Sequence, residues 1–91
     1  MTVIYREKAE IRQARRYWER MWKKIGRKLE KESEKLGNMS ALMTKLTGEP
    51  KLNKMWPKFE HQIELVDMLH TQHHLALEEM NKFILKEKRA V

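Results

Sequence analysis

Apolar and charged residues alternate with a helical period over residues 5–36. On a helical wheel of about 100° per residue, the apolar side chains of this stretch fall in one sector and the basic ones in another. The apolar sector contains Ile11, Ala14, Trp18, Met21, Trp22, Ile25, Leu29 and Leu36. The pattern predicts a long amphipathic helix whose apolar side, tryptophans included, faces a core or a subunit interface. The less favoured alternative is that nucleic-acid bases stack on Trp18 and Trp22.

A second periodic stretch occupies residues 56–88. Apolar residues and histidines recur there at alternating spacings of four and three, the heptad pattern of helices that pack closely along a partner. The positions are Phe59, Ile63, Val66, His70, His73, Leu77, Met80 and Ile84, and Leu65, Leu69, Ala76 and Phe83 widen this seam to one side. Pro57 fits the first turn of this helix, where a missing N–H group is tolerated.

The segment between the two stretches carries turn and capping residues. Gly37-Asn38 is a plausible end for the first helix, and Ser40 is a good N-cap for a short helix over 40–47 that Gly48 ends. The sequence therefore predicts a single helical domain over residues 1–91. Its fold is all-α: an antiparallel hairpin of two long helices, about 5–36 and 56–88, with a short corner helix.

Self-association is expected because 91 residues make a thin core and the chain has no cysteine with which to reinforce it. A second hairpin would complete a helical bundle, either as a homo-oligomer or within a larger assembly. We expect these side chains in the core or at a subunit interface: Trp18, Met21, Trp22, Ile25, Trp56, Phe59, Ile63, Val66, Leu77, Met80 and Ile84.

The formal net charge is +7, and most of it is local. Residues 6–35 hold twelve Lys or Arg against six Glu, whereas residues 36–91 hold eight against seven acids. One side of the first helix has no acid within it, and Glu19 lies at its edge. This basic face comprises Arg12, Arg16, Arg20, Lys23, Lys24, Arg27 and Lys28. Such a face predicts a non-enzymatic nucleic-acid-binding or nucleoprotein component that contacts phosphates without reading sequence.

Other interpretations of the same residues stay open. The basic face could be a solvated surface, or it could bind an acidic protein surface or an anionic membrane. The chain would then be a helical accessory or adaptor subunit of a protein complex. Its apolar contact would come from the corner, which holds Met39, Leu42, Met43, Leu46 and Trp56.

All four histidines lie between residues 61 and 74. A third interpretation is a metal-binding bundle that uses Asp67, His70, His73, His74 and Glu78. Alternatively, His70 and His73 are core polar residues that pair with each other, with a Glu or with a Trp indole, and so fix the register of packing. No cofactor is expected.

Several classes of function are disfavoured by what the sequence lacks. It has no cysteine nucleophile, no Gly-rich phosphate loop and no arrangement of acids that indicates catalysis, so we do not expect an enzyme. No apolar run approaches the ~20 residues of a membrane span, and the N-terminus has no apolar secretory segment. We expect an intracellular protein of a reducing compartment, in the cytoplasm or an organellar matrix.

Overall fold

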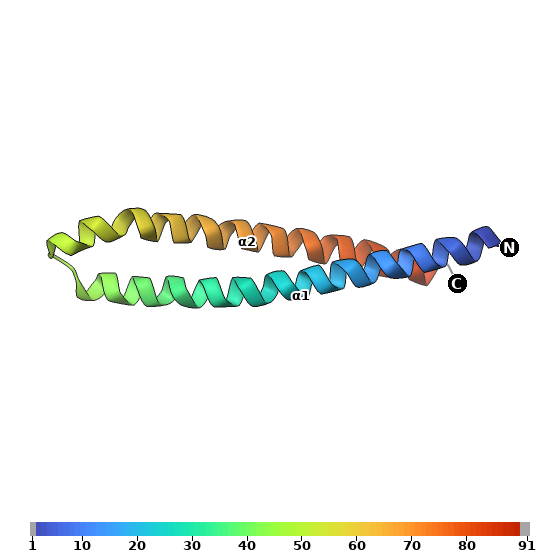
Figure 1. The fold of residues 1–91 in the computed structure, drawn as a ribbon, viewed down its shortest axis with the longest axis horizontal. Coiled ribbons are helices and arrows are strands. Elements are labelled where there is room, and N and C mark those ends of the chain that lie inside the picture. Colours follow the sequence, from blue (N-terminus) through green and yellow to red (C-terminus); the bar gives the residue numbers. More distant parts are fainter. Residues whose placement is uncertain (1, 90–91) are drawn as a thin grey trace. The chain divides into compact units, whose positions relative to one another are not determined.

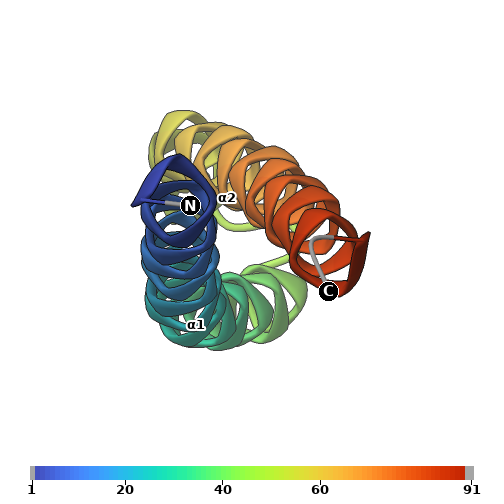
Figure 2. The same cartoon turned by 90° about the vertical axis from the view of Figure 1, so that its right-hand side faces the viewer.

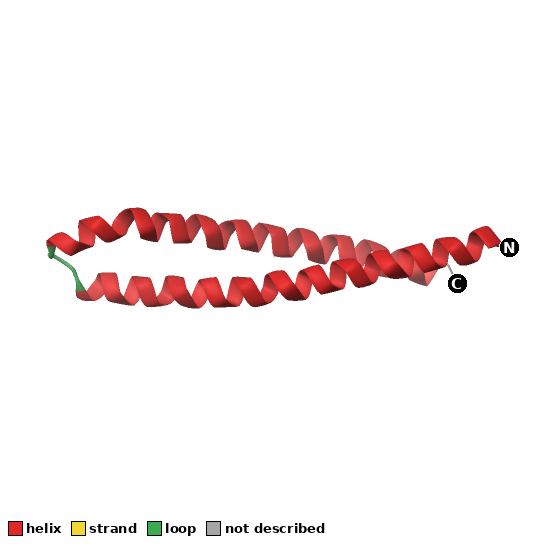
Figure 3. Cartoon of the chain, in the orientation of Figure 1, coloured by secondary structure: helices red, strands yellow, loops and turns green. Residues whose placement is uncertain are grey.

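The computed structural model describes residues 2–89, with side chains from Glu7 onward. These residues are all-helical and contain no strand: helix α1 (Thr2–Lys45) and helix α2 (Pro50–Arg89) form a helical hairpin (Figure 1, Figure 3). The chain divides into two compact units. One is Gly26–Thr71, and the other joins the stretch that ends at Ile25 to the stretch that begins at Gln72. Each unit is described separately.

The unit Gly26–Thr71 contains the turn between the helices, drawn as the green loop in Figure 3. The backbone N–H of Leu46 donates to the carbonyls of Leu42 and Met43, both at 3.1 Å, which closes the last turn of α1. Gly48 follows with φ of +85°, a left-handed conformation that favours glycine. The N–H of Glu49 then donates to the carbonyl of Leu46 at 2.9 Å, and α2 begins at Pro50.

The predicted break at Gly37-Asn38 is absent, and the short helix 40–47 is instead the end of α1. Glycine in a helix costs about 1 kcal/mol relative to alanine. Met39 is half-buried and Met43 is buried one turn further on, so continuing the helix buries more apolar surface than a break would. Propensity is overridden by packing at this point.

The second long helix also begins earlier than predicted, at Pro50 rather than near residue 56. Pro57 therefore lies inside α2, where it cannot donate a backbone hydrogen bond. Leu52 and Met55 precede it and are both half-buried. Their packing keeps the first turn and a half of the helix in place, and Pro57 itself is exposed.

The core of the unit Gly26–Thr71 is small and includes a polar layer. Its buried apolar side chains are Leu29, Met43, Val66 and Leu69. Gln62 is only 4% exposed, and its amide Nε2 donates to the Glu32 backbone carbonyl at 3.0 Å and to the Glu32 carboxylate at 2.7 Å. This layer satisfies a buried amide and links the two helices.

The other unit pairs the first part of α1 with the last part of α2, whose ends appear in the end-on view of Figure 2. Ala76 is its fully buried residue, at 1% exposed. Trp22 stacks on His73, with ring centroids 5.4 Å apart and ring planes 15° apart. Arg15 reaches Glu87 at 2.6 Å. The contact earlier in α1, at Arg15, is made with the later residue of α2, Glu87, whereas Trp22 contacts His73. The two helices are therefore antiparallel in this unit.

Burial along each helix follows an alternating spacing of three and four residues. We call these positions the core strip; all of them are buried or half-buried. On α1 the core strip is Lys8, Ile11, Arg15, Trp18, Trp22, Ile25, Leu29, Glu32, Leu36, Met39 and Met43, and Leu46 continues it just after the helix ends. On α2 it is Leu52, Met55, Phe59, Gln62, Val66, Leu69, His73, Ala76, Met80, Phe83 and Glu87.

The core strip of α2 differs from the predicted heptad at every second position. Phe59, Val66, His73 and Met80 belong to both. Between them the structure places Gln62, Leu69, Ala76 and Phe83 where the sequence pattern placed Ile63, His70, Leu77 and Ile84. Centring the contact on His70 would remove an imidazole from water, whereas the observed register buries Leu69 and leaves His70 exposed.

The two glycines near the turn should respond to alanine with opposite signs. Gly48→Ala forces a side chain into a positive-φ conformation and should cost about 1–2 kcal/mol. A Cβ at Gly37 meets nothing within 4 Å, so Gly37→Ala should stabilise the helix by roughly 0.5–1 kcal/mol. Thermal unfolding followed by circular dichroism should show midpoints on either side of the wild type. Equal shifts in the same direction would contradict the assigned conformations.

The Gln62–Glu32 layer should show the asymmetry of a buried hydrogen bond. Gln62→Leu leaves the half-buried Glu32 carboxylate without its donor and should cost about 1–3 kcal/mol. The double variant Gln62→Leu/Glu32→Leu removes both polar partners and should recover most of that loss. Urea unfolding of the two variants beside wild type measures this. A double variant less stable than Gln62→Leu would show that the layer does not act as a pair.

Candidate nucleic-acid interface

All seven side chains of the basic face are exposed on α1. Five of them belong to the unit whose part of α1 ends at Ile25: Arg12, Arg16, Arg20, Lys23 and Lys24. Arg27 and Lys28 belong to the unit Gly26–Thr71. They stay outside because the apolar residues between them occupy the core strip. The helix thus places the basic side chains and the apolar side chains, which are interleaved in the sequence, on different sides of α1.

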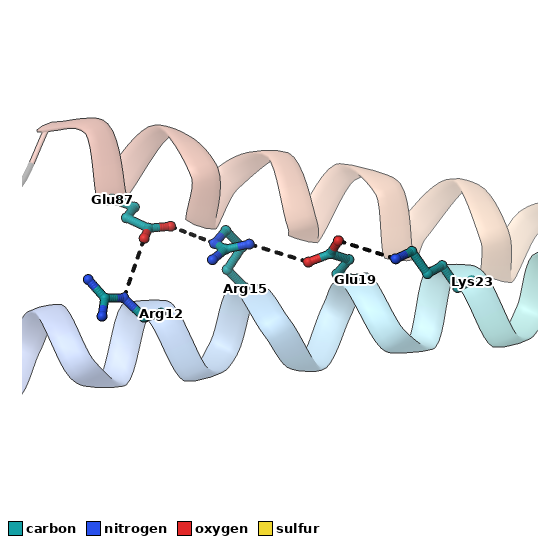
Figure 4. Close-up of polar contacts among 5 residues, drawn as sticks. All are labelled: Arg12, Arg15, Glu19, Lys23 and Glu87. Carbon is teal, nitrogen blue, oxygen red and sulfur yellow. Dashed lines mark hydrogen bonds and ion pairs between the residues drawn. The ribbon is translucent and has the colours of Figure 1, made fainter.

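An ion-pair network runs along the edge of the basic face (Figure 4). Glu87 of α2 accepts from Arg15 Nε at 2.6 Å and lies 3.7 Å from Arg12 Nε. Glu19 lies 3.3 Å from Arg15 Nη1 and 3.5 Å from Lys23 Nζ. Two carboxylates therefore partly neutralise three cations, and the pairs with Arg12 and Lys23 are solvated and weak.

Three cations of the same face stand apart from this network. Arg16, Arg20 and Lys24 are exposed, and they form no ion pair with the residues that the structure describes. Their spacing of four residues places them on one side of the helix over about 12 Å at 1.5 Å per residue. That length matches three to four phosphates of a strand that rises about 3.4 Å per nucleotide. These three side chains are the centre of the candidate interface.

The aromatic residues of the same helix divide between two environments. Trp18 and Trp22 are half-buried positions of the core strip. Tyr17 is 50% exposed beside the basic face, and its ring meets Trp18 edge-on at 5.2 Å. The tryptophans therefore do not form a platform on which bases could stack, and Tyr17 is the aromatic side chain that reaches solvent next to the cations.

The environment of Trp22 has one unusual feature. Its indole Nε1 is buried and has no hydrogen-bond partner among the described residues. The stacked His73 ring lies parallel to the indole and meets its face, so it does not accept from that N–H. An unmet buried donor of this kind costs about 1–3 kcal/mol. The stack with His73 offers a compensating contact at the same layer.

The structure does not assemble the predicted metal ligands. Within residues 2–89, no group of three or more His, Cys, Asp or Glu side chains is arranged to hold a metal ion. The register of α2 explains this: His73 turns into the core strip, while Asp67, His70, His74 and Glu78 are exposed. His74 Nε2 and Glu78 are a local pair at 2.9 Å. A single chain therefore does not support the metal-binding interpretation.

The last turns of α2 carry further solvated pairs. Lys82 donates to Glu79 at 2.9 Å, and this hydrogen bond, aided by the charge of Glu79, raises the pKa of Lys82 above its ordinary value. Lys82 is therefore a cation at neutral pH. It lies on α2 and does not belong to the basic face.

The predicted core and interface residues lie in three kinds of place. Val66 is buried. Trp56 and Ile63 are exposed, at 45% and 36%, and Trp56 meets Phe59 edge-on at 5.9 Å. The others are half-buried: Trp18, Met21, Trp22, Ile25, Phe59, Leu77, Met80 and Ile84. The exposure of Trp56 follows from the early start of α2, which gives the inward positions to Leu52 and Met55.

Sequence reasoning missed the polar members of the core strip. Arg15 and Glu87 are not among the predicted core residues, although their ion pair joins the two helices. Continuing the spacing of three and four back from Leu29 through Ile25, Trp22 and Trp18 arrives at Arg15. The signal was therefore present, but hydropathy alone hides a charged residue in such a pattern.

Within residues 2–89, no helix has a stretch long and apolar enough to cross a bilayer.

Comparison with known proteins finds no relative: no family model, curated protein or solved structure matches the chain.

Proposed function

We propose that this chain is a non-enzymatic nucleic-acid-binding protein that grips phosphates through the basic face of α1 without reading base sequence. The observation that carries the proposal is the exposed set Arg16, Arg20 and Lys24, which has no counter-ion within the described residues. Arginine holds a phosphate with two parallel hydrogen bonds, and lysine adds a mobile charge. Arg12 and Lys23 extend the same surface, and Arg27 and Lys28 are exposed on α1 in the unit Gly26–Thr71.

A contact made by charges on the face of a helix supplies affinity but little specificity. Base edges are read by side chains that enter a groove with defined hydrogen-bond geometry. The tryptophans are committed to the core strip, which supports a phosphate-only contact. The same chemistry would suit an acidic protein surface, and exposed Leu42 and Trp56 favour that adaptor role as the second candidate.

Self-association is also part of the proposal. A compact monomer of 11.1 kDa exposes about 5,700 Å². The chain exposes 7507 Å², and just five apolar side chains among the described residues are buried. The difference of roughly 1,800 Å² exceeds the ~800 Å² that one partner contributes to a standard interface. A second copy or a larger assembly would cover this surface.

Charge reversal on the basic face should abolish nucleic-acid binding. The variant Arg16→Glu/Arg20→Glu/Lys24→Glu lowers the formal charge from +7 to +1, since each change subtracts two. Wild type should bind labelled duplex DNA or RNA with a logarithmic salt slope of about −2.7 for three contacts, or about 100-fold weaker binding at 300 than at 50 mM salt. The variant should lose at least 100-fold at 50 mM, measured by fluorescence anisotropy.

A matched control separates this surface from bulk charge. Lys51→Glu/Lys54→Glu/Lys58→Glu also brings the charge to +1 but changes exposed lysines of α2. It should retain most of the affinity. Equal loss in both variants would reduce the effect to net charge, and absence of wild-type binding at 50 mM salt would overturn the proposed function.

Removing Glu87 should act in the opposite direction. Glu87→Gln releases Arg12 from its carboxylate partner and leaves Arg15 paired with Glu19, so Arg12 becomes available to phosphate. We expect affinity to rise a few-fold at 50 mM salt and the salt slope to steepen by up to about one. Glu78→Gln, which adds the same charge elsewhere on α2, is the control and should leave the slope unchanged. An unchanged slope for Glu87→Gln would place the phosphates away from Arg12.

A further inference from the structure

One outward face of α2, in the unit Gly26–Thr71, combines acids with apolar side chains. Trp56, Glu60, Ile63 and Asp67 follow each other at spacings of four, three and four residues, and Glu64 lies beside them. All five are exposed. We call this surface the acidic face. The carboxylates of Glu60, Glu64 and Asp67 form no ion pair with any residue that the structure describes.

The acidic face matches the basic face in spacing and opposes it in charge. Glu60, Glu64 and Asp67 are separated by four and then three residues. Arg16, Arg20 and Lys23 are separated by the same four and three. Both triplets span about 10 Å along a helix at 1.5 Å per residue. Laid side by side, each carboxylate meets a cation, and Lys24 lies next to the last pair.

The apolar parts of the two faces also correspond. Trp56 and Ile63 lie within the acidic face, and Tyr17, half exposed, lies beside the basic one. An arginine beside Trp56 would gain a cation–π contact as well as its ion pair. Desolvation by these three side chains would strengthen the pairs above the value of fully solvated ones.

We propose that the acidic face binds the basic face of a second copy of this chain. Charge complementarity on matched spacing selects this occupant, and the large accessible surface of the chain leaves room for it. Each copy offers both faces, so one copy can contact another through either of them. The chain is then its own competitor for nucleic acid.

The competition rests on the proposed function, because it requires that nucleic acid use Arg16 and Arg20. A phosphate strand and the carboxylates of a second copy cannot occupy the same guanidinium groups at once. Nucleic acid should therefore dissociate the self-associated protein, and self-association should lower the apparent affinity for nucleic acid as protein concentration rises.

The self-association can be tested without nucleic acid, by sedimentation velocity of the full chain at 50 and 500 mM salt. Wild type should associate at 50 mM and dissociate at 500 mM. The basic-face variant Arg16→Glu/Arg20→Glu/Lys23→Glu and the acidic-face variant Glu60→Lys/Glu64→Lys/Asp67→Lys should each raise Kd for self-association at least 10-fold. An equimolar mixture of the two variants should associate again, because each reversed face then meets a complementary one.

Each matched control has the same net charge as one of the two variants but leaves both faces intact. Lys51→Glu/Lys54→Glu/Lys58→Glu, at +1, pairs with the basic-face variant, and Glu30→Lys/Glu34→Lys/Glu49→Lys, at +13, pairs with the acidic-face variant. Both controls should associate like wild type. A wild type that stays monomeric at 100 µM and 50 mM salt would overturn the proposal, as would variants that associate normally or a mixture that does not recover.

Failure of this inference is distinguishable from failure of the proposed function. The acidic-face variant retains Arg16, Arg20 and Lys24, so it should bind labelled DNA or RNA at least as tightly as wild type. If this variant binds nucleic acid and also self-associates as the wild type does, the phosphate-binding proposal stands and the docking of the two faces is overturned. If both face variants lose self-association and no protein, wild type included, binds nucleic acid, the docking of the two faces stands and the phosphate-binding proposal is overturned.

Discussion

Each helix of this hairpin contacts one neighbour, and that constraint governs the rest of the structure. A helix with a single neighbour can bury one strip of side chains spaced by three and four residues, and nearly everything else along it stays in water. The strip therefore has to supply both cohesion and register. Leu69, Val66 and Leu29 supply cohesion. The polar layers determine the register, because apolar layers would still pack if one helix were shifted by a whole heptad.

Polar side chains interrupt the strip, and three contacts between the two helices involve them. Arg15 meets Glu87, Glu32 meets Gln62, and Trp22 meets His73. A slide by seven residues would place Gln62 opposite Ile25 or Met39 and leave its amide unsatisfied in the core, at about 1–3 kcal/mol. The polar layers thus disfavour the alternative alignments that a uniformly apolar strip would permit. Specificity here comes from groups that contribute little to cohesion.

The fold class could be predicted from the sequence, but the helix boundaries near the turn and the core-strip residues of α2 could not. Helical periodicity predicted two long helices, and the structure has them. The break at Gly37 and the late start at Pro57 were predicted from local propensity, which the burial of Met43 and Leu52 overrides. The register of α2 could not be read from hydropathy alone, because Ile63 and Leu77 are more apolar than Gln62 and Ala76, which take the inward positions. The site was more accessible to prediction: charge and exposure follow directly from the position of a residue on the wheel.

The position of the ion-pair network relative to the turn bears on how the hairpin forms. Gln62 and Glu32 are 30 residues apart in sequence, whereas Arg15 and Glu87 are 72 apart. Closing the longer loop from an unfolded chain costs roughly 0.8 kcal/mol more, whereas closing it after the turn has formed is nearly local. The hairpin should therefore zip from Gly48 outward and open in the reverse order. The contact of Glu87 with Arg12 and Arg15 opens first, so Arg12 of the basic face is released by fraying while the rest of the hairpin remains folded.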